Sequence, residues 1–363
     1  MNLKYAGSNL YGVKILEMSG ATVLVTGGAG YVGSHSVVQL LNQGFKVVVV
    51  DNLVNASPEC LKRVEEITGK KVISVLVDLC NKDEVDKVFS KYKIDCVIHF
   101  AALKAVGESV SMPLTYYRNN VGGSVTLLEV MKAHNVKKIV YSSSATVYGT
   151  PQELPLTEDH PTGLGCTNPY GKSKYFVEEM LKDLVKSDET WSVISLRYFN
   201  PVGAHESGKI GEDPKGVPNN IMPYIAQVAV GRRKDLRVFG NDYNTLDGTG
   251  VRDYVHIQDL AVGHIAATNK ILNPNFCGWK VYNLGTGSGL SVLQLVKAFE
   301  EASGQKIPCE VVGRRAGDID ASYADVSLAK KELHWEATRG VLDMCRDTWR
   351  WQSLNPNGYG ESE

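Results

Sequence analysis

Two side chains that can move a proton lie four positions apart in the segment NPYGKSK, residues 168–174. They are Tyr170 and Lys174. If the segment is helical, residues i and i+4 share one face and their side chains come within reach of each other. A tyrosine phenol ionises near pH ~10, and a neighbouring ammonium favours the phenolate. Such a pair is common on helices and is more often solvated than catalytic, so its surroundings must decide.

Glycines at regular spacing follow the first predicted strand in TGGAGYVG, residues 26–33. Gly27, Gly30 and Gly33 form G-x-x-G-x-x-G where that strand turns into a helix. This spacing lets the backbone approach a pyrophosphate, which the N–H groups of the helix then face. Asp51 closes the second strand 18 residues after Gly33, and a carboxylate there suits the hydroxyls of an adenosine ribose but repels a 2′-phosphate. The pattern favours NAD over NADP; the alternative is a simple tight turn.

A run of three serines, residues 142–144, ends another predicted strand. Ser144 would hydrogen-bond the reacting oxygen; the alternative is ordinary hydrogen bonding at a strand end. The serine run and the dinucleotide cradle make the Tyr170–Lys174 pair much more specific. A positively charged nicotinamide beside Tyr170 would lower the phenol pKa further towards neutrality. The phenolate could then take a proton from a hydroxyl while hydride leaves the same carbon.

Short runs rich in β-branched residues alternate with helical stretches in the first part of the chain. The runs cover residues 22–26, 46–51, 72–78, 96–101, 138–144 and 191–198. Their near-continuous apolar character is typical of parallel strands buried on both faces. Helical patterns at 36–44, 81–92 and 113–135 separate them. We therefore predict an α/β fold with a doubly wound parallel Rossmann sheet. Asp78 ends the third strand, where it would meet the adenine edge or cap the next helix.

The amino-acid composition changes after residue 200. Residues 201–255 are rich in Gly, Pro, Asn and Asp, with one helix at about 219–231 and one strand at 236–240; short strands at 280–285 and 308–313 follow. We predict an NAD-binding domain at 21–200 and a smaller, interleaved C-terminal α/β lobe at 201–363. The segment at about 252–272 could return to the first domain. Residues 1–20 lack the apolar core of a signal peptide and are predicted to be a flexible leader.

Charge and cysteine usage exclude several classes of protein. The 363 residues carry 39 Lys and Arg against 40 Asp and Glu, a net charge of −1. This balance argues against a broad nucleic-acid or anionic-lipid surface, and no apolar run approaches the ~20 residues that span a bilayer. The seven cysteines are odd in number and contain no Cys-x-x-Cys pair. Reduced thiols in the cytoplasm fit this pattern better than disulfides or a metal site.

Nine segments together resemble the UDP-galactose 4-epimerase (UDP-glucose 4-epimerase) family of the extended short-chain dehydrogenase/reductase superfamily. They are TGGAGYVGSH, HFAALKAVGES, SSSATVYG, NPYGKSK, RYFNPVGAH, GEDPKGVPNN, DGTGVRDYVH, YNLGTG and RRAGD. The resemblance runs from about residue 21 to the C-terminus. It implies an NAD-dependent isomerase of galactose metabolism that interconverts UDP-galactose and UDP-glucose. The route would be a transient 4-keto sugar and bound NADH, and the enzyme would be a homodimer.

The resemblance also assigns residues by their position in these segments. Besides the three cradle glycines, Asp51, Tyr170 and Lys174, it implies NAD contacts from Tyr31, Val32, Asn52, Asp78, Leu79, Phe100, Ala101, Lys104, Asn119 and Phe199. Around the UDP-sugar it implies Lys104, Ser144, Tyr170, Asn200, Asn220, Ile221, Leu236, Phe239 and Asp318, the last at the uridine ribose. Arg252 and Arg315 are our candidates for the diphosphate, because a guanidinium fork matches phosphate oxygens.

One position bears on substrate choice. Ser322 lies seven residues after Arg315, where the family differs in side-chain size. A tyrosine there restricts the pocket to simple hexoses, whereas a small residue leaves room for a 2-acetamido group. We therefore expect UDP-GalNAc and UDP-GlcNAc to be interconverted as well, unless another side chain fills the space.

Two other functions are compatible with a dinucleotide-binding fold. Nucleotide-sugar 4,6-dehydratases resemble this chain but place an Asp-Glu pair directly after the Ser/Thr position, where this chain has Ala145 and Thr146. A non-catalytic dinucleotide sensor would typically have lost the tyrosine or the lysine, and both are present here.

Overall fold

The computed structural model describes residues 5–6, 15–16, 20–315 and 317–360. Most of the predicted leader lies outside these residues. Inside it, β1 (Tyr5–Ala6) and β2 (Ile15–Leu16) pair antiparallel. Within the described part of the chain, no helix is long and apolar enough to cross a membrane.

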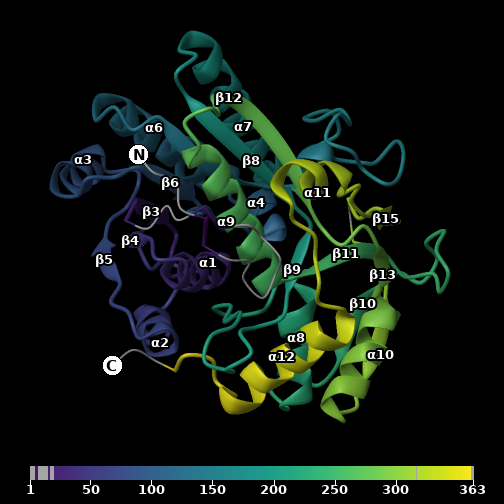
Figure 1. The fold of residues 1–363 in the computed structure, drawn as a ribbon. Coiled ribbons are helices and arrows are strands. Elements are labelled where there is room, and N and C mark those ends of the chain that lie inside the picture. The colour runs from purple at the N-terminus through teal and green to yellow at the C-terminus, as the bar shows by residue number, and fades with distance from the viewer. Residues whose placement is uncertain (1–4, 7–14, 17–19, 316, 361–363) are drawn as a thin grey trace.

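Seven parallel strands form the main sheet, in the order β12-β8-β7-β6-β3-β4-β5 (Figure 1). The strands are β3 (Thr22–Thr26), β4 (Lys46–Asp51), β5 (Ile73–Leu76), β6 (Cys96–His99), β7 (Lys138–Ser144), β8 (Ser192–Tyr198) and β12 (Gly278–Leu284). From β3 the chain first builds outward through β4 and β5, then returns to add β6 on the other side. The predicted doubly wound α/β class is confirmed, and its topological switch point lies between β3 and β6.

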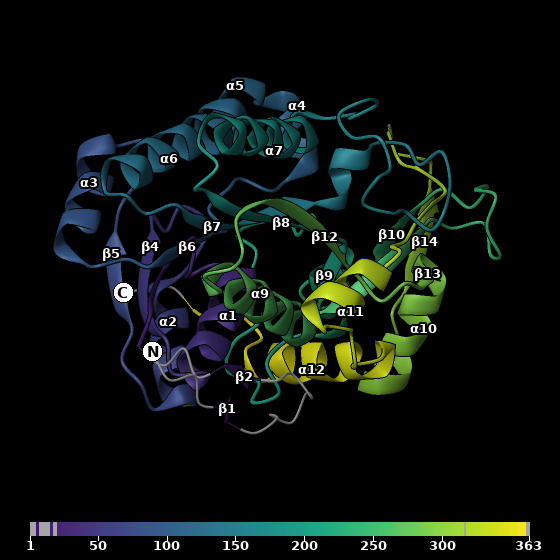
Figure 2. The same ribbon diagram turned by 45° about the horizontal axis from the view of Figure 1, so that its top comes forward.

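Helices cover both faces of this sheet (Figure 2). One face carries α1 (Tyr31–Asn42), α2 (Pro58–Thr68) and α9 (Ile257–Leu272); the other carries α3 (Lys82–Lys91), α6 (Gly123–Ala133) and α7 (Pro169–Ser187). Successive residues of a strand point to opposite faces, so Val23 and Val25 pack under the first group and Leu24 under the second. Both faces are buried, which is why the central strands read as continuous apolar runs.

The structure differs from the sequence prediction at both edges of the sheet. Strand β5 was predicted to be buried, but it is an edge strand on which Ile73 and Leu76 are exposed. Strand β12, predicted within the C-terminal lobe, pairs with β8 along its full length, from Gly278 beside Ser192 onward. The periodicity of a short segment predicts that it is a strand, but it does not predict which strand it pairs with. Helix α9, just after the lobe strand β11 (Val251–His256), packs on α1 and on β7 and β8.

The single helix predicted at 113–135 is three elements. After α4 (Val106–Ser111), the chain forms α5 (Pro113–Tyr116), a π-helical turn η1 (Tyr117–Gly122) and then α6. Apolar periodicity does not reveal an inserted π-turn, although such turns are frequent at functional sites.

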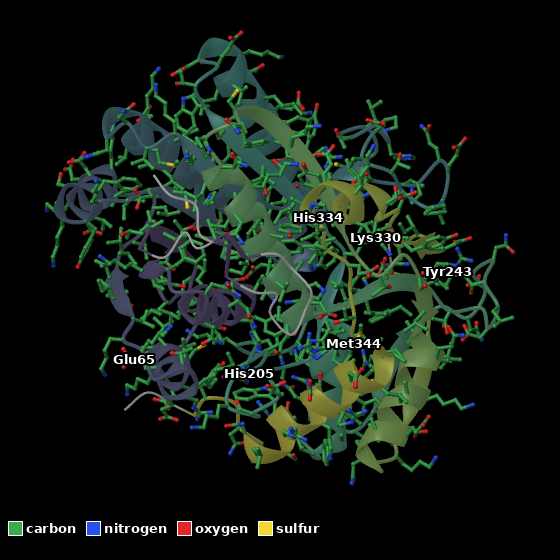
Figure 3. The ribbon with its side chains drawn as sticks, in the orientation of Figure 1. Glu65, His205, Tyr243, Lys330, His334 and Met344 are labelled. Carbon is green, nitrogen blue, oxygen red and sulfur yellow. The ribbon has the colours of Figure 1, made fainter. Side chains whose placement is uncertain are left out.

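The C-terminal lobe has its own small sheets and core. Strand β11 (Val251–His256) pairs with β13 (Gly289–Ser291), β15 (Ala321–Ser322) and β9 (Asn200–Val202), while β10 (Leu236–Phe239) pairs with β14 (Cys309–Val312). The lobe helices are α8 (Ile221–Ala229), α10 (Val292–Ser303) and α12 (Val341–Leu354), whereas α11 (Ser327–Leu333) packs on α9 and β12. Ile225, Phe299 and Met344 are buried in the core between α8, α10 and α12. Figure 3 labels Met344 on α12.

Candidate active site

One cavity of about 1160 Å³ follows the carboxyl ends of the main-sheet strands and continues into the C-terminal lobe. Pockets for one small molecule typically measure ~300–1,000 Å³. The volume therefore suits a dinucleotide together with a second ligand. In open α/β sheets, ligands bind at the switch point outside the strand ends, and the cavity lies there.

The glycine cradle forms the wall of the cavity after β3. Gly27 has a φ of +69°, and a Cβ there would lie 2.7 Å from the Ala101 nitrogen. A Cβ on Gly33 would lie 2.2 Å from the Gly27 carbonyl oxygen. Gly30 is the N-cap of α1 and has no side chain to satisfy the first N–H groups of the helix. A tight, side-chain-free turn ending in uncapped N–H groups fits a pyrophosphate, so the residues present fit a dinucleotide cofactor.

Two carboxylates mark the next strand ends. Asp51 accepts hydrogen bonds from the Ala29 N–H (3.0 Å) and the Leu53 N–H (2.9 Å). Burial raises the pKa of this carboxyl, and the two N–H groups oppose the rise. Asp78 accepts from the Cys80 N–H at 2.8 Å, whereas the N-cap of α3 is Asn81. Asp78 therefore does not cap the helix, and its side chain belongs to the cavity wall.

Helix α7 brings Tyr170 and Lys174 to the cavity, as the i, i+4 spacing predicts. The helix begins at Pro169, where the Asn168 side chain caps it by accepting from the Gly171 N–H at 2.9 Å. Lys174 is buried and donates from Nζ to the Ser142 carbonyl oxygen at 2.7 Å. Burial lowers the pKa of this ammonium to about 7, although Glu178 opposes the shift.

The pKa of Tyr170 differs from the sequence prediction. Burial raises it, and only the Ser144 hydroxyl acts in the opposite direction. The Lys174 nitrogen lies 6.0 Å from the centre of the phenol ring, and burial makes its own charge costly. The protein groups alone therefore do not lower the tyrosine pKa. The expected lowering would have to come from the charge of a bound nicotinamide.

Ser144 lies at the end of β7 and lines the same cavity. Its Oγ accepts hydrogen bonds from the Thr146 hydroxyl (3.0 Å) and the Thr146 N–H (3.3 Å). The strand-end hydrogen bonding weighed as an alternative is thus present. It does not exclude a role towards a ligand, because the residue also faces the cavity beside Tyr170.

The π-helical turn η1 ties two walls of the site together. Asn120 is buried; its Oδ1 accepts from the Leu103 N–H at 2.8 Å, and its Nδ2 donates to the Leu103 carbonyl at 3.0 Å and to the Ser173 hydroxyl at 2.9 Å. It thereby fixes the loop that carries Lys104 against helix α7. The neighbouring Asn119 lines the cavity. Sequence reasoning named Asn119 but missed Asn120, because its role depends on the unpredicted turn.

The lobe side of the cavity contains part of the predicted UDP-sugar set. Asn200, Asn220, Arg252, Asp318 and Ser322 line it. Ser322 is buried in β15, directly beside Arg252 in the strand register.

Four predicted residues, Ile221, Leu236, Phe239 and Arg315, do not line the cavity. Leu236 is buried in the lobe core because alternate residues of β10 point inward, and Ile221 packs against the same core. Phe239 points outward, and the Arg315 guanidinium lies 4.5 Å from its ring centre. Arg315 still reaches the cavity rim indirectly, because its Nε lies 3.5 Å from an Asp318 oxygen.

Comparison with known proteins identifies the family. The chain matches the family described as GDP-mannose 4,6 dehydratase over residues 24–348. A UDP-glucose 4-epimerase of Drosophila melanogaster is 62% identical, over 94% of this chain and 99% of the relative. The chain belongs to the UDP-glucose 4-epimerase family.

Solved structures agree with this family. The UDP-glucose 4-epimerase from Bifidobacterium longum, in complex with NAD+ and UDP, is 56% identical with a TM-score of 0.90, covering 93% of this chain and 100% of that one. The UDP-Glc/GlcNAc 4-epimerase from Campylobacter jejuni is 33% identical with a TM-score of 0.79, covering 92% and 99%.

Sequence reasoning within this epimerase family missed one wall of the cavity. Glu212, Asp213 and Lys215 line it, together with Tyr359 from the C-terminal segment. The first three lie in GEDPKGVPNN, a segment that carried the resemblance, so their sequence signal was present but unassigned. Tyr359 has no sequence signal, because its approach to the cavity depends on how α12 packs.

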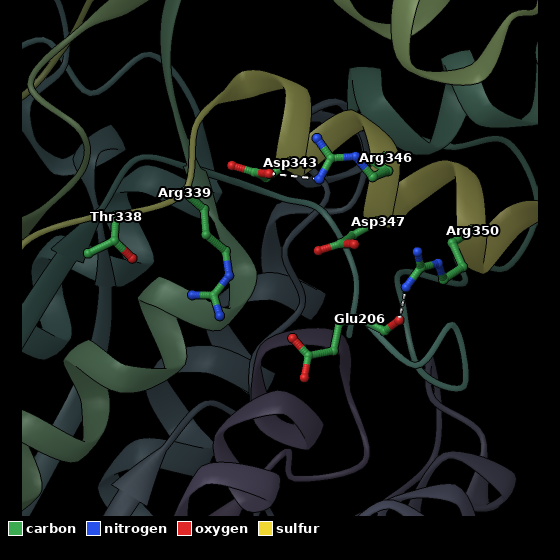
Figure 4. A pocket seen from close by; sticks show the side chains of 7 residues that line it. All are labelled: Glu206, Thr338, Arg339, Asp343, Arg346, Asp347 and Arg350. Atoms are coloured by element: carbon green, nitrogen blue, oxygen red, sulfur yellow. Dashed lines mark hydrogen bonds and ion pairs between the residues drawn. The ribbon is translucent and has the colours of Figure 1, made fainter. Parts of the chain in front are cut away.

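A second cleft, of about 570 Å³, lies outside this cavity at the start of α12 (Figure 4). It is lined by Glu206, Thr338, Arg339, Asp343, Arg346, Asp347 and Arg350. Its arginines are already bonded within the protein: Arg346 to Asp343 (3.0 Å), Arg350 to the Glu206 carbonyl (2.6 Å) and Arg339 to Asp259 (2.5 Å). Three acidic side chains balance them, so the cleft is no strong anion site.

Proposed function

We propose that the protein interconverts UDP-galactose and UDP-glucose by reversible epimerisation at C4, with NAD as its cofactor. The observation that carries the proposal is the single cavity that joins the glycine cradle to Tyr170 and continues to Arg252. When bound, NAD+ supplies an acceptor for hydride from the sugar and returns that hydride later. The sugar is oxidised to a 4-keto form and reduced again, so no net redox change occurs.

The chain's own residues hold the reactants and move the proton. Tyr170 takes the proton of the sugar 4-hydroxyl, and Ser144 hydrogen-bonds the same oxygen. Lys174 is held beside the phenol by its bond to the Ser142 carbonyl, with its Nζ 6.0 Å from the centre of the Tyr170 ring. Arg252 faces the diphosphate, where a guanidinium fork matches phosphate oxygens. Asp51, already held by two backbone N–H groups, presents its carboxylate to the adenosine ribose.

We also propose activity on UDP-GalNAc and UDP-GlcNAc. The small side chain of Ser322 lines the cavity next to Arg252, which leaves room beside the sugar for an acetamido group. The Campylobacter jejuni relative, named as a UDP-Glc/GlcNAc 4-epimerase, supports this extension.

The dehydratase reaction is the nearest alternative, because the matching family is described by that name. A dehydratase needs an acid and a base at C5 and C6 of the sugar. Ala145 and Thr146 occupy the two positions after Ser144, and neither is a carboxylate. Both Tyr170 and Lys174 are in the cavity wall, which disfavours a sensor without catalytic activity.

A coupled assay separates these functions. Purified protein loaded with NAD is given UDP-galactose, and the formation of UDP-glucose is followed through a UDP-glucose dehydrogenase. We expect turnover without net NADH accumulation on the epimerase itself. A 4-keto-6-deoxy product would indicate a dehydratase, and binding without any product would indicate a sensor.

Two further proposals concern assembly and location. We propose a homodimer formed through exposed apolar residues of α4, α5, α7 and the junction between α4 and α5, which include Val110, Met112, Leu114 and Phe176. Exposed apolar patches of this kind are typical of protein interfaces. Leu114→Glu should then convert dimers to monomers in light scattering. We place the protein in the cytoplasm, which the seven free cysteines support.

For the domain division, we propose that residues 21–200 bind the cofactor and residues 201–363 supply most of the nucleotide-sugar site. Strand β12 and helix α9 are exceptions, since both pack with the main sheet, and so is α11, which packs on these two.

A further inference from the structure

A partly buried carboxylate lies between the two halves of the cavity. The Glu212 side chain is 10% exposed, and its Oε1 lies 2.7 Å from the Lys104 Nζ. The same oxygen accepts a hydrogen bond from the Asn220 Nδ2 at 2.8 Å. Lys104 comes from the loop after β6, and Asn220 from the N-terminus of α8. One oxygen thus joins a side chain of the main domain to a side chain of the C-terminal lobe.

The segment that carries Glu212 is held at both ends. Lys215 donates from Nζ to the Leu53 and Val54 carbonyls (both 3.1 Å), beside the predicted ribose site. Asp213 accepts from the Tyr359 N–H at 2.9 Å, and the Glu212 carbonyl accepts from the Trp351 indole at 3.3 Å. Glu212 therefore approaches Lys104 and Asn220 from a fixed backbone, and its position is set before any ligand binds.

A carboxylate in this wall of the cavity opposes the binding of an anionic ligand. A cavity for two diphosphates favours positive charge, and an acid in its wall repels phosphate unless a cation is paired with it. Glu212 is paired with the one cavity-lining lysine that was predicted to meet both ligands. Its geometry suits a support for that lysine better than direct contact with an anion.

We propose that Glu212 is a positioning residue, which holds Lys104 and Asn220 in the places where they bind the ligands. It couples the nucleotide-sugar side of the cavity to the cofactor side. The inference rests on the proposed function, because it takes the diphosphate sugar as the ligand of Lys104 and Asn220. Loss of Glu212 should weaken ligand binding with little change in the rate of the bound complex.

The test compares Glu212→Gln with a matched control in the NAD-loaded enzyme. The amide keeps the size of the side chain and can accept from Asn220, but it loses the ion pair with Lys104. We expect the Kd of UDP, measured by calorimetry, and the KM of UDP-galactose to rise about fivefold, because an ion pair to a half-exposed lysine is lost. The kcat should change by less than about twofold. NAD content after gel filtration should fall, since Lys104 also faces the cofactor side.

Glu66→Gln is the control. Glu66 forms an ion pair of the same length, 2.7 Å, with Lys209 on the same segment, but neither residue lines the cavity. This variant should bind UDP as the wild type does. If Glu66→Gln loses as much UDP affinity as Glu212→Gln, any ion pair that fixes this segment has the same effect. The proposed positioning role of Glu212 is then wrong.

A double-mutant cycle isolates the route through Lys104. If Glu212 acts through this lysine, Lys104→Met alone should weaken UDP binding. Adding Glu212→Gln should then change the Kd much less than it does in the wild type. An undiminished effect in the Lys104→Met background would overturn the proposal, as would wild-type UDP affinity in Glu212→Gln. Absence of UDP-galactose turnover in the wild type would instead refute the proposed function, while the UDP-binding cycle could still be read.

Discussion

The cofactor half and the nucleotide-sugar half of the cavity are built in different ways. Every residue predicted to contact NAD lines the cavity, whereas Ile221, Leu236, Phe239 and Arg315 of the predicted nucleotide-sugar set do not. The cofactor half consists of strand ends and backbone turns, such as the Gly27 turn against Ala101. The other half depends on long side chains from loops, such as the Arg315 guanidinium that stacks on Phe239. The shape of the cofactor half is determined by the backbone fold. The shape of the nucleotide-sugar half depends on the conformations of individual side chains.

The largest expected effect lies where the two halves meet. Tyr170→Phe removes the hydroxyl that transfers the proton but keeps the ring that fills the space. General acid–base groups contribute ~10²–10⁴-fold, so we expect kcat to fall about 10³-fold. NAD content, measured after denaturing the purified protein, should be unchanged. A variant that keeps more than about a tenth of wild-type kcat would mean that another group moves the proton.

The rigidity of the cofactor half is tested by a pair of glycine substitutions. In Gly33→Ala the new Cβ would lie 2.2 Å from the Gly27 carbonyl oxygen, so the cradle must shift. We expect NAD content to fall at least about tenfold, because the phosphate-binding turn loses its geometry. Gly313→Ala, on the lobe side, meets no atom within 4 Å and should leave NAD content and UDP affinity unchanged. Equal tolerance at both positions would remove the contrast between the two halves.

The same contrast explains what the sequence could predict. The strands around the switch point, the cradle and the spacing of Tyr170 and Lys174 depend on local patterns, and they were predictable. The place of β12 beside β8 and the π-turn that carries Asn120 depend on tertiary pairing, which single-sequence periodicity does not contain. Glu212 was within a recognised segment, but its role became visible only when Lys104 and Asn220 were seen to meet it.

The family resemblance predicted residues by position, and those assigned to the cofactor all line one cavity, whose wall there is largely backbone. It was less complete for the uridine side. There the direction of a side chain in β10 decides between core and cavity, and Leu236 points into the core.

The nucleotide-sugar half should be tunable without disturbing the cofactor half. In Ser322→Tyr, the added ring would fill cavity space beside Arg252. We expect kcat/KM for UDP-GalNAc to fall at least about 100-fold, because an overpacked pocket excludes the larger sugar. Turnover of UDP-galactose should stay within about threefold, and NAD content should not change. If both sugars are affected equally, Ser322 does not gate the acetamido group; Ser322→Ala, which keeps the space open, is the control.

The smallest effect concerns how the free energy of unfolding depends on pH. It tests whether burying Lys174, where the two halves meet, destabilises the folded protein. The folded protein keeps the Lys174 pKa at about 7, whereas an unfolded lysine ionises near pH ~10.4. Between these values the unfolded chain binds a proton that the folded protein does not. Burial of this lysine therefore lowers the free energy of unfolding by its full amount below pH 7. This loss of stability becomes smaller as the pH rises from 7 towards the unfolded pKa.

Lys174→Met removes the titrating group but keeps an unbranched side chain of similar length. From pH 7 to pH 9, the wild type should gain stability relative to this variant by up to about 1.4 kcal/mol per pH unit. Urea unfolding of both proteins at pH 7, 8 and 9 measures the difference. Loss of the bond to the Ser142 carbonyl adds a constant offset and leaves the slope unchanged. The positive charge of bound NAD+ lowers the lysine pKa further, so it does not reverse the sign. If the free energies of unfolding of the two proteins change with pH in parallel, Lys174 keeps an ordinary pKa in the folded protein. Its burial would then not destabilise the fold.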